Sequence, residues 1–336
     1  MVICYDRTWL FLDKKCFVMN LLVKGYYGYK NFGDELILLA LLGWIDENFG
    51  SYQIFISAGD EKWLEKRIVN HKRYYPAGML EKITVLPKSD KIQLAKEALG
   101  MGEDWDFVVL GGGQVVDEDR KFPHDGWNIP MLYRKYLNEG KVALIGGIGT
   151  ENKDGTALLH KILLDRSKII LLRDKFSEGL AEKYLNEEKK EKKLQTVGDL
   201  SLPILENFKN QMIVSYEKSQ RDPYVLINVS PEVDFDASVR KIKLFLSRFP
   251  QCQPVFFAAH AVDDMKYFSR LQELFPSLEL FDWTQAGVEK TLNLFYFAEA
   301  GIGQRLHFLY ILKFLGKEYE VLKMTHKIQV NLLDID

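Results

Sequence analysis

The run Gly303-Gln304-Arg305-Leu306-His307 places a guanidinium and an imidazole two residues apart. They lie at the start of a predicted helix over residues 306–314. Amides at a helix start and a fixed positive charge both favour an anion. An imidazole titrates near neutral pH and suits a general acid or base. A single histidine is more often structural, but the arginine and the glycine-containing run around it favour a catalytic His307 and an anion-binding Arg305.

A second arginine, Arg173, directly follows a predicted strand over residues 169–172. Its planar guanidinium is suited to bidentate recognition of a phosphate or a carboxylate. The alternative is a structural ion pair with Asp174.

Glycines follow the first predicted strand, over residues 20–25, in a loop that runs to Glu35. Glycines allow a tight turn and a close approach to a ligand, so this loop is predicted to form one wall of a site. Asp34 and Glu35 are explained well enough as acids that cap the following helix. The glycine spacing is not that of a dinucleotide-binding fingerprint. The loop residues predicted to lie at the site are Gly28, Asn31, Gly33 and Asp34.

Gly111-Gly112-Gly113-Gln114 follow the predicted strand over residues 107–110. Three residues without side chains favour the close approach of a phosphate or a sugar, and the alternative is a tight crossover against a neighbouring strand. The polar segment 117–128 downstream is predicted to be a loop over an acceptor. Asp117 is its candidate for proton transfer, although a solvated acidic loop explains it as well.

Two further basic residues follow predicted strands of the second half, His260 after residues 254–258 and Lys327 after residues 319–322. Both are predicted to line the site. No grouping of His, Asp, Glu or Cys has metal-ligand spacing, so the sequence requires neither a metal nor another cofactor.

The 336 residues carry 45 Lys and Arg against 47 Asp and Glu, a formal charge of -2, so no global attraction to nucleic acid is expected. Three scattered cysteines fit reduced thiols. The early apolar patch is too short for a signal peptide, and no apolar run reaches the length of about 20 residues that crosses a bilayer. We therefore expect a cytoplasmic protein, for which any contact with the membrane would be peripheral and at its inner face.

Short apolar runs alternate with segments of helical period, which is typical of parallel α/β units. The length exceeds what one core usually organises. We expect two Rossmann-like doubly wound domains facing a cleft, similar to two-domain (GT-B-type) glycosyltransferases, with the site at the carboxyl ends of the strands. Residues 1–18 are expected to be an N-terminal extension, or the result of a mis-assigned start before a natural start at Met19, and the alternative is an extra edge strand. The predicted divisions are 19–205 for the N-terminal domain on the acceptor side, 206–222 for a linker, and 223–336 for the C-terminal domain on the donor side.

These motifs, in this order and spacing, resemble the polysaccharide pyruvyl transferases. The resemblance spans most of the chain and implies phosphoenolpyruvate as donor and a cell-surface glycan or its lipid-linked precursor as acceptor, on which a pyruvate ketal is built. It maps donor binding onto Arg305, Leu306 and His307, with Gly303 and Gln304 beside them, and onto Arg173 from the other domain. The run Gln114 to Asp119 departs from the family, which more often has a small hydroxyl residue after the glycines.

Two other functions fit the same residues. One is a nucleotide-sugar-dependent glycosyltransferase of the same architecture, and the other is a non-catalytic glycan-binding protein. Response to phosphoenolpyruvate separates the first from a pyruvyl transferase, and the effect of replacing Arg305 and His307 separates the second.

Overall fold

The computed structural model describes residues 18–89, 96, 103–116, 133–148, 157–214 and 222–333. The chain divides into two compact units, which we call the first unit (residues 1–29 and 37–200) and the second unit (residues 30–36 and 201–336). The division falls at Leu200, earlier than the residue 205 expected from the sequence. Each unit contains one parallel sheet with helices, so the predicted fold class is confirmed.

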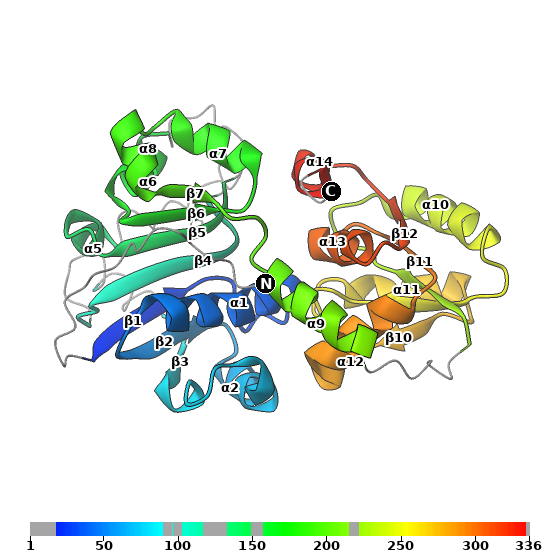
Figure 1. Cartoon of the computed structure of the whole chain (residues 1–336). Helices are drawn as coiled ribbons and strands as arrows, with labels where there is room; N and C mark the ends of the chain where they lie inside the picture. Colours follow the sequence, from blue (N-terminus) through cyan, green and yellow to red (C-terminus); the bar gives the residue numbers. More distant parts are fainter. Residues whose placement is uncertain are drawn as a thin grey trace. The chain divides into compact units, whose positions relative to one another are not determined.

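The first unit contains a seven-stranded parallel sheet in the order β3-β2-β1-β4-β5-β6-β7 (Figure 1). Its central strands are buried on both faces, which explains why they are continuous apolar runs rather than alternating ones. The strands are β1 (Met19–Lys24), β2 (Tyr52–Ala58), β3 (Ile83–Pro87), β4 (Phe107–Val116), β5 (Val142–Ile148), β6 (Ile169–Leu172) and β7 (Leu194–Thr196).

Helices connect these strands, and aspartates cap two of them. Asp60 accepts a hydrogen bond from the Trp63 amide at the start of α2, and Asp174 accepts one from the Ser177 amide at the start of α7. The helices are α1 (Phe32–Asn48), α2 (Glu61–Asn70), α5 (Arg134–Asn138), α6 (Ala157–Arg166), α7 (Lys175–Glu182) and α8 (Glu187–Lys193), with the 3-10 turns Lys72–Tyr74 and Leu80–Lys82.

Three details of the first unit differ from the sequence-based expectation. The edge strands β3 and β7 are short and only partly buried, so they lack the apolar run that identifies a strand. The charged stretch 187–193 has the composition of a solvated surface turn, but it forms α8, where ion pairs such as Lys192 with Glu188 support an exposed helix. The glycines 111–113 lie inside β4, which continues to Val116 through an irregularity in its pairing with β5.

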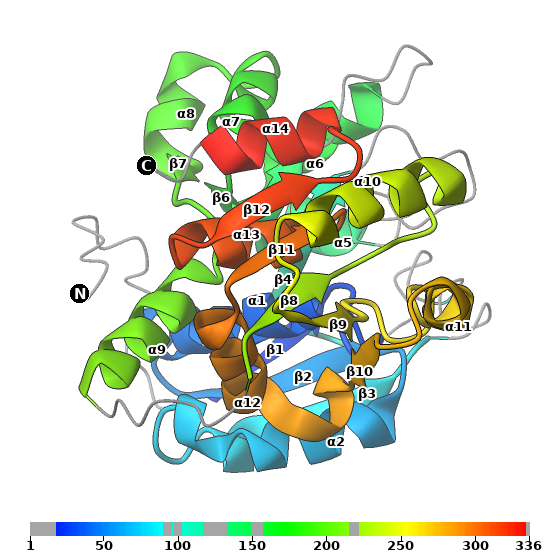
Figure 2. The same ribbon diagram turned by 90° about the vertical axis from the view of Figure 1, so that its right-hand side faces the viewer.

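The second unit contains a five-stranded parallel sheet in the order β10-β9-β8-β11-β12 (Figure 2). Its strands are β8 (Tyr224–Ile227), β9 (Gln253–Phe257), β10 (Glu279–Phe281), β11 (Ala300–Gly303) and β12 (Glu318–Val321). Its helices are α9 (Leu202–Val214), α10 (Phe235–Ser247), α11 (Met265–Leu274), α12 (Trp283–Phe297), α13 (Leu306–Phe314) and α14 (His326–Leu333).

Two elements of the second unit were not predicted. Residues 206–214 were expected in a linker, but they belong to α9. No strand was predicted over Ala300–Gly303, whose Ala-Gly-Ile-Gly composition is typical of a loop, but this run is the fully buried strand β11. Small residues are needed there because a Cβ at Gly303 would lie 2.6 Å from the Phe308 ring, and one at Gly301 would lie 2.5 Å from Leu312. Gly303 therefore serves the packing of α13 on its own strand.

The first turn of α1 belongs to the second unit although it lies far from it in sequence. The Phe32 amide donates to the Ala259 carbonyl at 2.8 Å, and the Ala261 amide donates to the Lys30 carbonyl at 2.9 Å. The buried Phe32 ring packs edge-on against Phe257 and Trp283. Residues 30–36 are therefore part of the second unit's core.

Candidate functional site

Arg305 is the N-cap residue of α13, and a buried carboxylate fixes its side chain. Its Nη2 donates to Asp264 Oδ1 at 2.7 Å, and its Nε lies 3.1 and 3.3 Å from the two carboxylate oxygens. The Asp264 side chain is 0% exposed and that of Arg305 is 20% exposed. Burial lowers the pKa of Arg305, but the hydrogen bonds and charge of Asp264 outweigh it and hold that pKa above its ordinary value. Arg305 is a permanent, directed positive charge.

Asn228, directly after β8, ties this pair to the start of α13. Its Oδ1 accepts the Arg305 amide at 2.9 Å and the Gln304 amide at 3.4 Å. Its Nδ2 donates to Asp264 Oδ2 at 3.0 Å. One buried side chain thus holds both the backbone and, through Asp264, the guanidinium of Arg305.

Gln304 lies between β11 and α13 and is 2% exposed. Its Oε1 accepts the Lys323 amide at 2.8 Å, which links the end of β11 to the end of β12. Lys323, which follows β12, is thus bonded through its amide to the residue before Arg305. Its Nζ lies 3.4 Å from the Glu232 carbonyl oxygen. The Glu232 side chain in turn lies 3.6 Å from Arg305 Nη1. Lys323 and Arg305 thus both contact Glu232, the first at its carbonyl and the second at its carboxylate.

His307 lies in the first turn of α13, and its Nδ1 edge packs against Gly33 in the first turn of α1. A Cβ at Gly33 would overlap the imidazole ring, so this position requires glycine. Gly33 and His307 are therefore in contact, and their membership of one functional site stays a prediction. Leu306, the first residue of α13, is buried and faces the core instead.

His260 follows β9 and lies beside this group. It forms an antiparallel β-bridge with Asn31, and its amide donates to Asp264 Oδ2 at 3.0 Å. Its Nδ1 accepts the Asp263 amide at 3.1 Å, which assigns the ring proton to Nε2. Burial lowers the pKa of His260, the neighbouring carboxylates oppose this, and the net shift is downward. The imidazole is therefore neutral at pH 7.

Arg173 lies at the carboxyl end of β6 in the first unit, and its ion pair with Asp174 is present. Its Nε donates to Asp174 Oδ2 at 3.1 Å and its Nη1 donates to the Gly113 carbonyl at 2.6 Å. The Ser177 hydroxyl accepts the Ile148 amide at 2.9 Å. These bonds join β4, β5 and β6 to α7. Arg173 thus has a structural role, since it links the end of β6 to β4, and a ligand-binding role for it stays a prediction.

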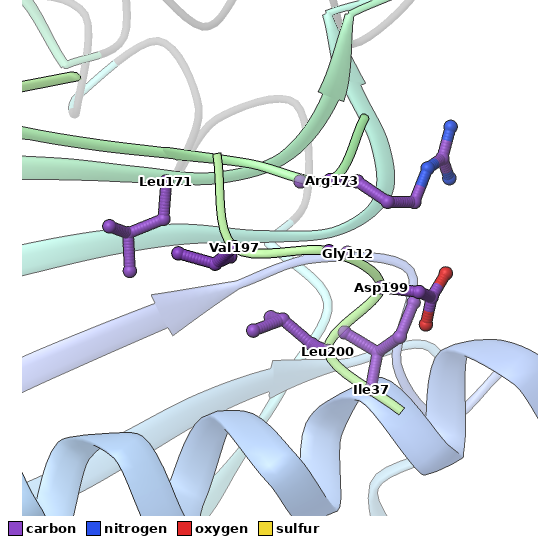
Figure 3. A pocket seen from close by; sticks show the side chains of 9 residues that line it. Ile37, Gly112, Leu171, Arg173, Val197, Asp199 and Leu200 are labelled. Carbon is purple, nitrogen blue, oxygen red and sulfur yellow. The ribbon is translucent and has the colours of Figure 1, made fainter. Parts of the chain in front are cut away.

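Arg173 lines a pocket at the same edge of the first unit's sheet, together with glycines and the Asp199 side chain. Figure 3 shows the Arg173 guanidinium and the Asp199 carboxylate pointing toward the same side. Both side chains are buried. The pocket is lined by Ile37, Gly112, Gly146, Leu171, Arg173, Val197, Gly198, Asp199 and Leu200.

The glycines around this pocket have different roles. Gly112 has φ 144° and Gly146 has φ 148°, a backbone conformation that favours glycine, and both line the pocket. By contrast, a Cβ at Gly147 would lie 2.5 Å from the Arg173 Nη2, and one at Gly111 would lie 2.8 Å from Leu41. Gly111 and Gly147 therefore make room for the protein's own side chains, and Gly112 and Gly146 border the pocket.

The remaining predicted residues are placed as follows. Gly28 has φ 74° and makes the turn after β1, and Lys327 lies in the first turn of α14. Asp34 is buried in the first turn of α1, and its negative charge is one of those that oppose the lowering of the His260 pKa by burial. Gln114 lies in β4, and Asp117 lies outside the described residues.

Three residues of the second unit's site were not predicted, namely Asn228, Asp264 and Lys323. Each lies within two residues after a strand or just before a helix, where function is expected, but a lone Asn, Asp or Lys there carries no distinguishing pattern. Lys323 follows the predicted strand over residues 319–322, and this position was the one available signal.

Among the described residues, no three His, Cys, Asp or Glu side chains are grouped so that they could hold a metal ion. Within the same residues, no helix combines the length and apolar character of a membrane span.

Solved structures with a similar fold are UDP-GlcNAc 2-epimerases. The enzyme from Neisseria meningitidis, bound to UDP-GlcNAc, matches with a TM-score of 0.60 at 12% identity, over 93% of this chain and 85% of that one. The enzyme from Methanocaldococcus jannaschii matches with a TM-score of 0.57 at 12% identity, over 94% and 86%. At such identities the likeness shows the fold, which is the GT-B type predicted from the sequence.

No curated protein matches the sequence. The family model described as polysaccharide pyruvyl transferase matches residues 31–311, which include the Asn31 bridge, Arg173 and the Arg305 to His307 motif. The chain therefore belongs to the polysaccharide pyruvyl transferase family, as its motifs indicated.

Proposed function

We propose that this enzyme transfers the pyruvyl group of phosphoenolpyruvate to a sugar of a cell-surface polysaccharide or its lipid-linked precursor, forming a pyruvate ketal and releasing phosphate. The observation that carries the proposal is the Arg305 guanidinium, held by Asp264 and Asn228 at the start of α13 with His307 in the same turn. Membership of the family supports the same reaction.

Donor binding follows from charge. Phosphoenolpyruvate carries a phosphate and a carboxylate, and anions are stabilised by guanidinium groups and by the amides of a first helical turn. Asp264 occupies Nε and Nη2 of Arg305, so Nη1, which lies 3.6 Å from the Glu232 carboxylate, is the nitrogen we assign to the donor. Lys323 adds a cation from the neighbouring strand end.

The chemistry needs one acid and one base. Protonation of the methylene carbon of the donor gives a methyl group and an oxocarbenium-like centre at its second carbon, and a sugar hydroxyl attacks this centre and loses a proton. The bond to the phosphate oxygen then breaks, and a neighbouring hydroxyl closes the ketal and loses its proton. The two sugar hydroxyls release two protons in all. One of them replaces the proton that the acid gave to the methylene carbon, and the other leaves with the phosphate. We assign proton transfer to His307, with Asp117 as a second candidate base.

The test is the thermal shift produced by phosphoenolpyruvate, combined with phosphate release in the presence of galactose, mannose and N-acetylmannosamine glycosides. We expect stabilisation by the donor in the wild type and its loss in Arg305→Ala. We expect phosphate release to require an acceptor and to be lost in His307→Ala.

The control is Lys313→Ala, which removes a cation from the other end of the same helix. Donor binding unchanged in Arg305→Ala, or no phosphate release with any acceptor, would contradict the proposal. Stabilisation by UDP-sugars without a response to phosphoenolpyruvate would select a nucleotide-sugar glycosyltransferase on this fold. Glycan binding that survives replacement of both Arg305 and His307 would select a non-catalytic protein.

A further inference from the structure

Two tyrosines in the turn after β1 form a stacked pair. The Tyr26 and Tyr29 ring centroids are 4.2 Å apart, with an angle of 9° between the planes. Tyr26 is 42% exposed. Tyr29 is partly buried because it covers Gly59, where a Cβ would lie 2.7 Å from the ring. Lys88 Nζ lies 5.5 Å from the Tyr29 centroid. Tyr29 is therefore fixed between backbone and the exposed ring of Tyr26.

The turn that carries the pair is tied to the loop after β2. The Gly59 amide donates to the Tyr27 carbonyl at 2.9 Å, and the Asp60 amide donates to the Gly28 carbonyl at 3.1 Å. Tyr27 itself is 0% exposed and anchors the turn in the first unit. A ring held in this way loses little further freedom when a ligand covers it.

The pair lies at the sheet edge that carries the pocket of Arg173. The Tyr26 amide nitrogen lies 3.9 Å from the position that a Cβ on Gly112 would occupy, and Gly112 lines that pocket. Because residue 112 is a glycine, no side chain of this residue separates the Tyr26 backbone from the pocket wall. The turn that carries the stacked pair therefore adjoins, at Gly112, the pocket that contains Arg173 and Asp199.

We propose that Tyr26, supported by Tyr29, is a platform on which a pyranose ring of the acceptor stacks. The C–H groups on one face of a pyranose carry partial positive charge and match the negative face of an aromatic ring, while the hydroxyls at the ring edge remain available for reaction. The identity of the sugar as a pyruvyl acceptor rests on the proposed function, but the stacking contact does not.

The experiment compares Tyr26→Ala, which removes the ring, with Tyr26→Phe, which keeps it. Gly59→Ala is a second variant, because its methyl group displaces the Tyr29 support. Leu244→Ala, at a 71% exposed position on α10, is the control for truncation of an exposed apolar side chain. Melting curves of all four verify folding.

For Tyr26→Ala we expect the KM for the acceptor to rise about tenfold, with the KM for phosphoenolpyruvate within about twofold of wild type. Gly59→Ala shifts the acceptor KM in the same direction, and Tyr26→Phe and Leu244→Ala leave it unchanged. An acceptor KM for Tyr26→Ala equal to that of Leu244→Ala, or an equal loss in Tyr26→Phe, overturns the platform.

If no sugar supports phosphate release, the proposed function fails and the platform is judged by binding alone. Saturation-transfer NMR on methyl pyranosides then reports contact between the sugar C–H groups and the protein. Signals that are present with the wild type and lost with Tyr26→Ala support the platform, and signals that are absent or unchanged by the substitution overturn it.

Discussion

Asp264 determines where the Arg305 guanidinium points. It accepts hydrogen bonds from Arg305, Asn228 and the His260 amide, and its side chain is 0% exposed. An amide at this position would turn an NH₂ group toward at least one of these donors.

We expect Asp264→Asn to lower the free energy of unfolding by about 3 kcal/mol, because a buried pair loses one partner. We expect kcat/KM for phosphoenolpyruvate to fall about a hundredfold if Arg305 is misplaced by an ångström or so. Chemical denaturation and steady-state kinetics measure the two effects.

The adjacent Asp263→Asn is the matched control. Its side chain is 40% exposed and pairs with Lys266 at 2.8 Å, so we expect a change of under about 0.5 kcal/mol. Similar effects of the two substitutions would show that Asp264 has no special role in holding Arg305.

His71, in the first unit, gives a pH-dependent stability. Burial, followed by the charges of Arg67 and Arg73, lowers its pKa from 6.5 to about 3. Its stabilising contribution is complete above the unfolded pKa and is lost as the pH falls toward the folded value, because the unfolded chain binds a proton that the folded chain excludes.

We expect the wild type to lose about 2 kcal/mol more than His71→Gln between about pH 6.5 and pH 4.5. Urea unfolding at both pH values measures this difference. Identical losses in the two proteins would assign the acid sensitivity to other groups.

The motif Arg305 to His307 could be recognised from sequence because its residues are neighbours in the chain. Asp264 could not be connected to Arg305, since only the fold brings a residue 41 positions earlier to the guanidinium. Arg173 was recognised by its place after a strand, but its bond to the Gly113 carbonyl is tertiary.

At the scale of elements, helix α1 contains two glycines with opposite requirements. Gly33, in its first turn, leaves the space that the His307 ring occupies, whereas a Cβ at Gly43 would have nothing within 4 Å. Alanine at Gly43 therefore tests helix propensity alone, whereas alanine at Gly33 also tests the packing against His307.

We expect Gly33→Ala to lower the melting temperature and to abolish stabilisation by phosphoenolpyruvate, because His307 or the first turn of α1 must move. We expect Gly43→Ala to be neutral or stabilising by about 0.5–1 kcal/mol. Thermal melts with and without the donor test both, and tolerance of alanine at Gly33 would contradict the packing described for His307.

The strands recognised from the sequence include those with continuous apolar runs, and the strands that were missed are partly exposed, such as β3 and β7, or rich in small residues, such as β11. β4 and β6 were recognised by runs of Val, Leu and Ile. β11 consists of Ala-Gly-Ile-Gly because Phe308 and Leu312 pack directly on it, and so it has the composition of a loop.

At the scale of the whole molecule, the two units have separate cores. The first centres on residues such as Val108, Leu144 and Ile170, and the second on residues such as Ile227, Phe256 and Ile302. Phe32 belongs to the second unit, whereas Phe49, just beyond the other end of α1, packs against Trp44 and Phe107 in the first.

Truncating each ring should destabilise the unit to which it belongs, the second unit for Phe32 and the first for Phe49. We expect Phe32→Ala to cost about 3–5 kcal/mol and to speed hydrogen exchange in β9 and α12, and Phe49→Ala to speed it in β1 and β4. Exchange measured by mass spectrometry localises the effect. Faster exchange in the first unit alone for Phe32→Ala would contradict the placement of residues 30–36.

The membership of residues 30–36 in the second unit also bears on biosynthesis. These residues leave the ribosome early, but the strands that receive Phe32 are made much later. At typical rates of synthesis, the interval between Phe32 and its partner Trp283 is about 13–50 s. During that time the first turn of α1 lacks these partners, so we expect the nascent chain to expose the apolar Phe32 ring that the folded protein buries.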